Sequence, residues 1–288
     1  MAEHRVGPYR IVRPIGKGGM GRVYLAIDDQ KDRKIAIKVL PEQFLEDKKK
    51  YEYLRRELEI ARELDHPNVV DISDIIELRR KSDGKLQGFM LMEFIDGHNL
   101  REHITAQDLT ISRALELCEQ ICAGLNYIHR HRLQDGRYHS IIHRDIKPEN
   151  ILITRRGRVK IVDFGLSTEE KHFQFLRSKS RAGTPQYMSP EHINGKRVDE
   201  RSDIYSLGVC MYELFTGKPP YEAKNRKEIM KMHVSRKVKP RPPSSVNPKI
   251  PPSLSRIIMT ALEKDPERRY QSVAELQLAL KHVSVSRI

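Results

Sequence analysis

The sequence predicts an α+β fold with two lobes, in which an antiparallel β-sheet with one main helix precedes a mostly helical part. Two observations predict this fold. Up to about Leu40 the chain consists of short β-rich runs broken by turn residues, and beyond Gly97 apolar residues recur at helical spacing. The pattern changes near residues 95–98, so we expect a first lobe over about 9–95 and a second over about 96–283.

The first lobe is expected to begin as an antiparallel meander. The runs YRIVRPI, RVYLAI and KIAIKVL each suit a strand, and DDQKDR suits the turn before the last of them. Apolar residues at helical spacing predict a helix over 46–64, which DHPN ends. Two further strands are predicted in VVDISDIIEL and GFMLMEFI, joined by the polar loop RRKSDGKLQ.

The second lobe is expected to be a series of helices. They are predicted over about 99–106 and in ISRALELCEQICAGLNYIHRH, SDIYSLGVCMYELFTG, SLSRIIMTALEK and SVAELQLALKHV. Segment 141–191 is short-stranded and rich in motifs, and the proline-rich stretch KPRPPSSVNPKIPP is predicted to be a loop without helix. Residues 1–8 and 284–288 are expected to be short tails.

Composition indicates a globular protein. No stretch of the 288 residues approaches the roughly 18 apolar residues of a membrane span, and the first residues lack the apolar core of a secretory signal. We therefore expect a cytoplasmic location. Cys118, Cys122 and Cys210 have no ligand spacing, so neither a disulfide framework nor a zinc site is expected. Cys118 and Cys122 are one helical turn apart and are expected in a buried stripe.

The formal net charge of +14 is spread along the chain, for example in RHRLQDGR, LRSKSR and SRKVKPR. A basic surface of this kind favours acidic partners in general. With no Trp, 6% aromatic residues and no nucleic-acid-binding module, nucleic acid is not expected as a partner.

The stretch IGKGGMGRVY places glycines at 16, 18 and 21. A dinucleotide-binding fold would need a helix directly after the third glycine and alternating βαβ units, whereas here RVYLAI continues as a strand. Glycines in a β-hairpin turn allow backbone N–H groups to close over phosphates. A hairpin that is merely tight is the alternative.

Lys38 lies amid apolar residues in the next predicted strand, where a buried ammonium group needs an anion. Glu57 in the following helix could pair with it and hold the amine toward phosphate oxygens. It is favoured by its position nine residues before His66, although the same helix also offers Glu52, Glu59 and Glu63. A lysine that extends to solvent from a strand edge is the alternative.

Residues 143–150, HRDIKPEN, combine a carboxylate, an ammonium group and a carboxamide. A hydroxyl that attacks a terminal phosphoryl group needs a carboxylate to take its proton, a cation near the transferred charge, and oxygen ligands for magnesium. Asp145, Lys147 and Asn150 suit these three roles in turn. Asp163 in KIVDFG also suits magnesium, although each carboxylate alone could be a cap or turn residue.

Together these motifs resemble the signature set of protein kinases, and the chain resembles most the bacterial serine/threonine kinases of eukaryotic type. The matching motifs are the glycine-rich loop at 16–23, the strand lysine in IAIK, the catalytic loop HRDIKPEN, the metal motif DFG and the activation-segment end GTPQYMSPE. The resemblance covers about residues 9–283, nearly the whole chain, and implies one catalytic domain.

The resemblance implies a two-lobed protein kinase fold with ATP and Mg²⁺ (or Mn²⁺) in the cleft, and transfer of the γ-phosphoryl group to serine or threonine of protein substrates. Asp145 would be the base, Lys147 would contact the γ-phosphate, and Asn150 with Asp163 would hold the metal. The residues implied to bind ATP are Ile15, Gly16, Gly18, Gly21, Val23, Ala36, Lys38, Glu57, Met92, Glu93 and Ile95. Within that set Lys38 would contact the α and β phosphates, and the backbones of Glu93 and Ile95 would bind adenine.

Further residues are implied as supports or specificity elements. Asp203 would anchor the backbone of the catalytic loop, and Glu191 would pair with Arg269. Lys147 and Thr184 imply serine or threonine specificity rather than tyrosine specificity.

Arg144, beside the catalytic aspartate, implies a basic pocket that phosphate on the activation loop would neutralise. Ser178 is the first candidate for this phosphate and Ser180 the second, with Ser167 and Thr168 as further hydroxyls in the loop. Phosphorylation of one copy by another would require a transient homodimer.

Two alternatives remain open. A pseudokinase scaffold would typically lack the strand lysine, the catalytic aspartate or the metal aspartate, all of which are present here. A small-molecule phosphotransferase with a kinase fold would not need the peptide-positioning segment GTPQYMSPE. The extra residues 132–140 are expected to be a surface elaboration, with docking as the alternative role.

Overall fold

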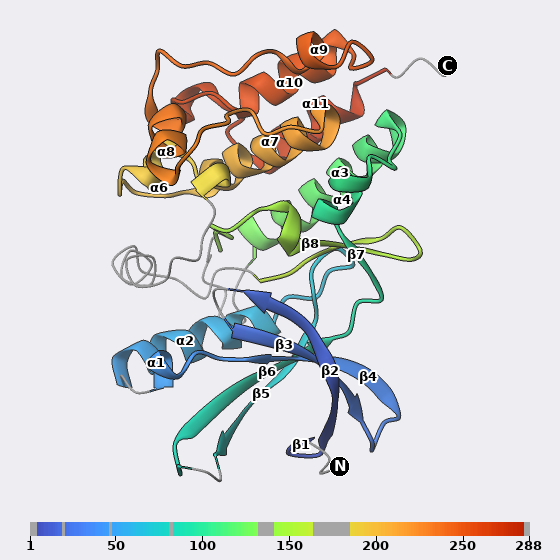
Figure 1. The fold of residues 1–288 in the computed structure, drawn as a ribbon, viewed down its shortest axis with the longest axis vertical. Helices are drawn as coiled ribbons and strands as arrows, with labels where there is room; N and C mark the ends of the chain where they lie inside the picture. Colours follow the sequence, from blue (N-terminus) through green and yellow to red (C-terminus); the bar gives the residue numbers. More distant parts are fainter. Residues whose placement is uncertain are drawn as a thin grey trace. The chain divides into compact units, whose positions relative to one another are not determined.

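The computed structural model describes residues 5–18, 21–45, 48–80, 83–131, 141–163 and 185–284 (Figure 1). Within these ranges the side chains of residues 17, 18, 43, 44, 48–50, 53, 54 and 57 are not described. The described residues form two compact units. The first takes in 5–66 and Val70–Asp96, and the second takes in Pro67–Val69, 97–163 and 185–284.

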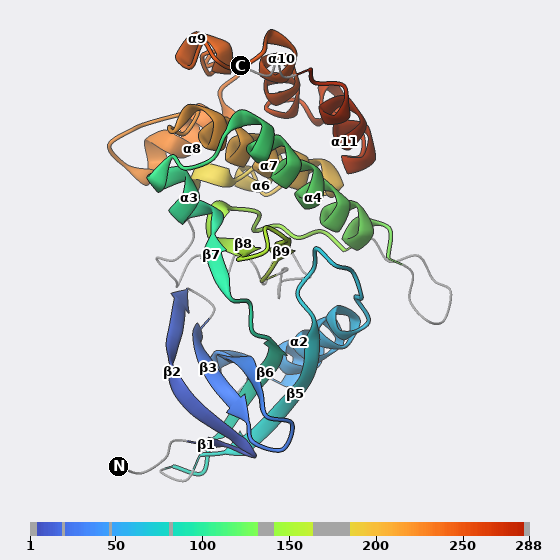
Figure 2. The same ribbon diagram turned by 90° about the vertical axis from the view of Figure 1, so that its right-hand side faces the viewer.

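The first unit is built on a six-stranded sheet of order β1-β2-β3-β4-β6-β5, in which every neighbouring pair is antiparallel (Figures 1 and 2). Its strands are β1 (Arg5–Val6), β2 (Tyr9–Gly18), β3 (Gly21–Asp28), β4 (Arg33–Val39), β5 (Ile72–Arg79) and β6 (Leu86–Glu93). The predicted meander is therefore confirmed.

The two faces of this sheet have different contents. One face holds a buried apolar cluster of Ala26, Ile35, Ile37 and Leu91, against which Val6, Tyr9, Ile11, Ile76 and Phe89 pack. Because successive side chains of a strand point to opposite faces, Ala36 and Lys38 of β4 point away from this cluster. The sheet thus separates a hydrophobic core from a second face that a ligand could use.

Two helices complete the first unit, α1 (Glu42–Leu45) and α2 (Lys48–Arg62). The helix predicted over 46–64 is confirmed as α2, whereas the short α1 was not predicted. Leu58 and Ala61 are buried, and α2 contacts β5 (Figure 2).

The second unit is mostly helical. Its helices are α3 (Leu100–Ala106), α4 (Ile111–His129), α6 (Pro190–Ile193), α7 (Glu200–Thr216), α8 (Arg226–Val234), α9 (Pro243–Val246), α10 (Pro252–Ala261) and α11 (Val273–Lys281). A small antiparallel sheet joins β7 (Gly97–Asn99), β8 (Ile151–Thr154) and β9 (Val159–Ile161), and the 3-10 helices are η1 (Pro148–Asn150), η2 (Pro185–Tyr187) and η3 (Pro266–Arg268).

Helix α7 is the centre of this unit. Most of its residues are buried, since it packs against α4, α10 and α11. Gly208 allows a close approach to α10, because a Cβ there would lie 2.9 Å from the Cβ of Ala261. Asp199 caps the start of α7 through the N–H of Arg201, and Gly217, with φ +74°, ends it.

Two helices of the second unit correct the sequence-based expectations. Helix α8 was not predicted, although Asn225 accepts from the N–H of Glu228 as a helix cap. The expectation that the proline-rich stretch contains no helix is wrong, because α9 begins at Pro243 within it. Proline suits the first helical position, where its fixed φ fits and its missing N–H is not needed.

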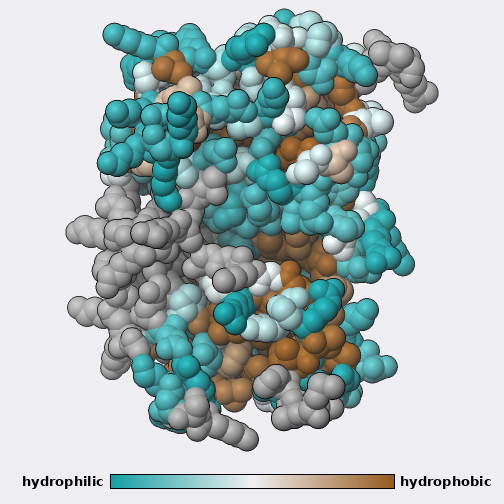
Figure 3. Space-filling model, in the orientation of Figure 1, coloured by the Kyte–Doolittle hydropathy of each residue, from teal (hydrophilic) through white to brown (hydrophobic). Residues whose placement is uncertain are grey.

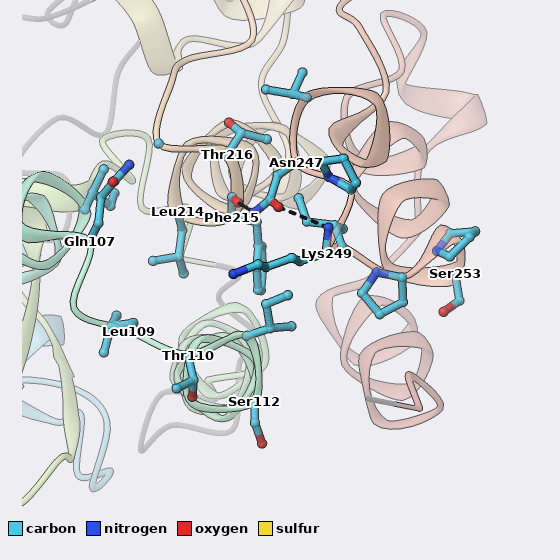
Figure 4. Close-up of a pocket in the computed structure, with 18 of the residues that line it drawn as sticks. Gln107, Leu109, Thr110, Ser112, Leu214, Phe215, Thr216, Asn247, Lys249 and Ser253 are labelled. Atoms are coloured by element: carbon cyan, nitrogen blue, oxygen red, sulfur yellow. Dashed lines mark hydrogen bonds between the residues drawn. The ribbon is translucent and has the colours of Figure 1, made fainter. Parts of the chain in front are cut away.

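The proline-rich loop is held against the end of α7. The Asn247 side chain donates to the carbonyl of Phe215 (3.0 Å) and accepts from the N–H of Lys249 (3.1 Å), as Figure 4 shows. The loop, the α3–α4 connection and the start of α10 surround a pocket of about 1590 Å³. None of the predicted site residues lines this pocket.

The three cysteines are free thiols, and all are buried in the second unit. Cys118 and Cys122 have no exposed surface, so the predicted buried stripe on α4 is confirmed. Burial raises the pKa of Cys118 to about 12, and it raises the pKa values of Cys122 and Cys210 as well. In the described part of the chain, no helix is both long and apolar enough to cross a bilayer.

Candidate active site

The predicted site residues fall into two groups, one in each unit. In the first unit the glycine motif is a β-hairpin, since β2 pairs with β3 through Gly16 opposite Val23 and Gly18 opposite Gly21. A strand, not a helix, follows the third glycine, which excludes the dinucleotide-binding arrangement. The turn residues 19–20 lie outside the described residues.

Gly21 is the glycine of this hairpin that the structure requires most clearly. Its φ is +123°, and a Cβ at this position would lie 2.1 Å from the carbonyl oxygen of Val39. Any side chain would therefore collide with the backbone of β4. The close approach keeps the start of β3 directly against the strand that contains Lys38.

Strand register brings the other predicted residues to one face of the sheet. Cross-strand partners point to the same face, and Val23 is paired with Lys38, while Ala36 is paired with Met92. The residues on this face are Val23, Leu25, Ala36, Lys38, Met90 and Met92. It is the face opposite the buried apolar cluster, so the strand alternation alone groups four predicted nucleotide-binding residues.

Lys38 is the one buried lysine in this face, with 2% of its surface exposed. Glu57 belongs to α2, as predicted, but its side chain lies outside the described part of the structure. The Lys38–Glu57 pair therefore stays a prediction.

The remaining predicted residues of this unit lie near the ends of strands β2 and β6. Ile15 falls where β2 has one more residue than β3, between the pairs of Pro14 and Gly16, and its side chain is 37% exposed. At the end of β6, the N–H of Glu93 donates to the carbonyl of Asp71 (3.0 Å), and the Glu93 carboxylate accepts from the N–H of Asp71 (2.9 Å). These bonds fix the start of the segment in which Ile95 lies.

The second group is centred on Asp145. One oxygen of its carboxylate, Oδ2, accepts from Nζ of Lys147 at 2.6 Å and from Nδ2 of Asn150 at 3.0 Å. Asn150 also donates to the backbone carbonyl of Asp145 (2.8 Å), and η1 brings the amide back over the loop. The carboxylate, ammonium group and carboxamide predicted from HRDIKPEN therefore meet at one point.

Asp203 anchors this loop from α7. Its carboxylate accepts from the backbone N–H groups of His143 (2.7 Å) and Arg144 (2.8 Å) and contacts Nε2 of His129 (2.8 Å). The side chain has no exposed surface. Burial alone would raise the pKa of Asp203, but the bonds from His129 and His143 outweigh it and hold the pKa below its usual value. The predicted anchoring contact is present.

His143 is fixed as a neutral ring. Its Nδ1 accepts from the N–H of Asp145 (3.3 Å), and its Nε2 lies 3.1 Å from the carbonyl oxygen of Val162, to which it can donate. Burial lowers the pKa of His143 despite the nearby carboxylates. The imidazole therefore links the Asp145 loop to the strand end before Asp163 without adding charge.

Asn150 and Asp163 are joined through the backbone, because the N–H of Val162 donates to the carbonyl of Asn150 (3.0 Å). Since Nδ2 of Asn150 is directed at Asp145, its amide oxygen is the atom that could bind a metal. One carboxylate and one amide oxygen fit Mg²⁺, which usually keeps few protein ligands and completes its shell with phosphate and water. Among the described residues, no three His, Cys, Asp or Glu side chains form a closed metal site.

The predicted support pair Glu191–Arg269 is present and buried. The guanidinium donates to both carboxylate oxygens at 2.8 Å, and Ser202 donates to Oε1 at 2.5 Å. Burial would raise the pKa of Glu191, but the Arg269 bonds dominate and lower it to about 2.

Sequence reasoning missed Arg101 of α3. Its guanidinium donates to Glu149 beside the catalytic loop (3.0 Å), to Glu213 in α7 (2.5 Å) and to the Tyr187 hydroxyl in η2. Burial raises the pKa of Tyr187, whose hydroxyl also donates to Glu213 (2.5 Å). No local pattern marks Arg101, because its partners lie between 48 and 112 positions away.

Several predicted residues lie outside the described part of the chain. They are Thr184, the activation-loop hydroxyls of Ser167, Thr168, Ser178 and Ser180, and the extra segment 132–140.

Known proteins resemble this chain over almost its entire length. The family described as protein kinase domain matches residues 9–283. The serine/threonine-protein kinase PrkC of Bacillus subtilis is 36% identical over 278 residues, covering 96% of this chain and 40% of PrkC. The serine/threonine-protein kinase PknB of Mycolicibacterium smegmatis is 36% identical over 284 residues, covering 98% of this chain and 44% of PknB. The chain thus spans less than half the length of these relatives.

Solved structures show the same fold. The crystal structure of the Mycobacterium tuberculosis PknI kinase domain superposes with a TM-score of 0.71 at 26% sequence identity, covering 98% of each chain. The two-lobed fold predicted from the sequence is therefore confirmed.

Proposed function

The chain belongs to the protein kinase family, and we propose from this premise that it is an ATP-dependent serine/threonine protein kinase. Members of this family use ATP and a divalent metal in general. The proposed catalytic domain spans residues 9–283, with the lobes at about 9–95 and 96–283. The proposal includes protein substrates and a cytoplasmic location.

The observation that supports this function most strongly is the meeting of Asp145, Lys147 and Asn150 at one carboxylate oxygen. In the proposed reaction Asp145 orients the acceptor hydroxyl and takes its proton as the oxygen attacks the γ-phosphorus. Lys147 offsets the negative charge on the transferred group, and the leaving oxygen remains on ADP.

The nucleotide is proposed to lie on the sheet face that contains Val23, Ala36, Lys38 and Met92, beneath the glycine hairpin. Lys38 would bind phosphate oxygens there, and an anion would stabilise an ammonium group that is 2% exposed. Asn150 and Asp163 would hold Mg²⁺ or Mn²⁺, which neutralises phosphate charge when bound.

Autophosphorylation of the activation loop is part of the proposal, with Ser178 and then Ser180 as the acceptors, through a transient homodimer. Arg144 would bind the phosphate. A pseudokinase scaffold remains the alternative from another class, and a small-molecule phosphotransferase the alternative within the fold.

The test compares the parent protein with Asp145→Asn and with Asp108→Asn, an exposed aspartate that serves as the matched control. Each is incubated with Mg²⁺, γ-labelled ATP and a generic serine/threonine protein substrate, and phosphosites are mapped by mass spectrometry. We expect kcat to fall by about 10²–10⁴-fold in Asp145→Asn only, because general-base catalysis is lost.

ATP binding, measured by thermal shift, should be unchanged in both variants. Labelling that persists in Asp145→Asn would exclude Asp145 as the base. ATP binding without any protein labelling in the parent would favour the scaffold, and labelling of small hydroxyl compounds alone would favour the small-molecule alternative.

A further inference from the structure

Residues 224–241 form a strongly basic segment that comprises helix α8 and the loop after it. The sequence KNRKEIMKMHVSRKVKPR contains eight Lys or Arg residues and one acidic residue, a formal charge of +7. That is half of the chain's net charge of +14 in a small fraction of its length, so the expectation of a charge spread along the chain is wrong for this segment. We call residues 224–241 the basic segment.

All eight basic side chains are exposed, namely Lys224, Arg226, Lys227, Lys231, Arg236, Lys237, Lys239 and Arg241. On α8, Ile229 and His233 are buried one turn apart, and Lys227 and Lys231 lie one turn apart on the opposite face. Figure 3 shows a hydrophilic surface over this helix at the upper left.

Little of this charge is neutralised by neighbours. Among the described residues, Arg236 is the one basic side chain of the segment in an ion pair, 3.6 Å from Asp265, and it is 80% exposed. The acidic residue of the segment, Glu228, accepts instead from the side chain of Asn225 at the helix cap (2.7 Å). The surface therefore keeps most of its positive potential.

Helix α8 is fixed to η2, in the described part of GTPQYMSPE, and to α7 through buried polar groups. His233 is 1% exposed, contacts the Tyr205 hydroxyl of α7 (2.8 Å) and bonds to the backbone of Gln186 in η2. Lys264 donates to the carbonyl of Met232 (2.8 Å) and to the Tyr221 hydroxyl (2.5 Å). Helix α8 of the basic segment therefore packs against η2, which belongs to the element implied to position peptides.

His233 is surrounded by Tyr205, Tyr221, Lys264 and the η2 backbone. The ring centroids of Tyr205 and Tyr221 lie 5.7 and 4.9 Å from that of the imidazole. Burial, with Lys264 nearby, lowers the pKa of His233 to about 3. The ring therefore stays neutral near neutral pH.

We propose that the basic segment is a docking surface for acidic stretches of the protein substrates, which names a substrate class for the function proposed above and rests on it. Opposite charge attracts such substrates and holds them near the acceptor site, mainly by lowering KM and raising the association rate. The segment has no Trp, Tyr or Phe, and its one imidazole, His233, is buried, so it offers nucleic-acid bases no exposed ring on which to stack. The one buried apolar residue of α8, Ile229, faces inward beside His233, unlike the exposed apolar face of a membrane-surface helix.

The test uses two peptides that share one serine acceptor and one flexible linker and differ in their tails, a run of glutamates or a run of glutamines. The parent protein is compared with Lys227→Gln/Lys231→Gln/Arg236→Gln/Lys237→Gln. The matched control, Arg156→Gln/Arg158→Gln/Arg256→Gln/Lys281→Gln, removes the same number of exposed charges elsewhere in the second unit.

For the parent and the matched control, we expect the KM of the glutamate-tailed peptide to be about three- to tenfold lower than that of the glutamine-tailed peptide. Several weak exposed ion pairs would give a difference of this size. The difference should shrink at high salt and disappear in the basic-segment variant, with kcat unchanged. Equal KM values for both peptides in the parent would overturn the proposal. It would also be overturned if the matched control lost the KM difference between the peptides as fully as the basic-segment variant does.

Binding of the fluorescent glutamate tail, followed by anisotropy, separates this proposal from the function itself. If the tail binds through the four residues but no peptide is phosphorylated, the proposed kinase function is wrong, while the basic segment still binds acidic peptides selectively. If vesicles containing phosphatidylserine, or an oligonucleotide, bind more tightly than the tail through the same residues, the surface serves another ligand and the proposal is wrong.

Discussion

The carboxylate of Asp203 holds the backbone of Arg144 in a left-handed conformation, accepting its N–H at 2.8 Å while φ of Arg144 is +62°. Such a φ in a non-glycine residue costs about 1–3 kcal/mol, which buried hydrogen bonds to a charged acceptor can offset. The residue after Arg144 is Asp145, so Asp203 of helix α7 determines where the predicted base lies.

Asp203→Asn is expected to lower both stability and kcat. The amide replaces one acceptor by a donor, so one of the N–H groups of His143 and Arg144 loses its partner in a buried site, at about 2–3 kcal/mol. Guanidinium unfolding and kcat measure the two effects, with Asp108→Asn as the exposed control. A variant as stable as the parent would contradict the anchoring role.

The Glu191–Arg269 pair predicts a pH dependence of stability. Glu191 has a folded pKa of about 2 against an ordinary 4.5, so its contribution is complete above about pH 4.5 and is lost as the pH falls toward 2. The free energy of unfolding of the parent should fall in this window. In Glu191→Gln the slope should be smaller, which urea unfolding at several pH values would measure.

Removing one partner of this pair should cost more than removing both. Glu191→Gln leaves the Arg269 charge buried without its anion, at about 3–5 kcal/mol, whereas Glu191→Gln/Arg269→Met removes the charge as well. We expect the double variant to be the more stable of the two at pH 7. If the stability lost in the double variant equals the sum of the losses in Glu191→Gln and in Arg269→Met, the two residues are not coupled.

Gly21→Ala is expected to disrupt the glycine hairpin, since its Cβ would lie 2.1 Å from the oxygen of Val39. Gly84→Ala is the matched control, because φ of Gly84 is also positive but no atom lies within 4 Å of its Cβ. The control should lose only about 1–2 kcal/mol of stability from its φ. Gly21→Ala should lose more stability than this control and should bind ATP more weakly in calorimetry. Equal losses of stability in the two variants would show that the backbone relaxes to remove the collision.

Asn150→Ala should raise the half-saturating Mg²⁺ concentration. The substitution removes a proposed metal ligand together with the two hydrogen bonds to Asp145, and a loss of roughly tenfold or more in metal affinity is expected. Asn194→Ala, at an exposed position, is the control. An unchanged Mg²⁺ dependence, with only kcat reduced, would mean that Asn150 positions Asp145 but does not bind the metal.

The catalytic turn was predictable from the sequence because its contacts are local. Asp145, Lys147 and Asn150 lie within six positions, so one tight turn is enough to bring them together. Strand alternation was predictable for the same reason, and it places Ala36 and Lys38 on one face.

Contacts between distant segments were not predictable from residue patterns. The partners of Arg101 come from three other elements, and no spacing in the sequence joins them. The Asp203 and Glu191 contacts were predicted only through the family resemblance. Helix α8 was missed since only Ile229 and His233 of its nine residues are buried, too few for a clear helical period in the sequence.

The burial of Cys118, Cys122 and Cys210 has a practical consequence for spectroscopy. A thiol reacts with maleimides as the thiolate, and these three are both shielded and held protonated by their raised pKa values. A cysteine introduced on the surface should therefore be the reactive one, without prior removal of native thiols. The distance between the two compact units could then be followed in solution by attaching one dye to each.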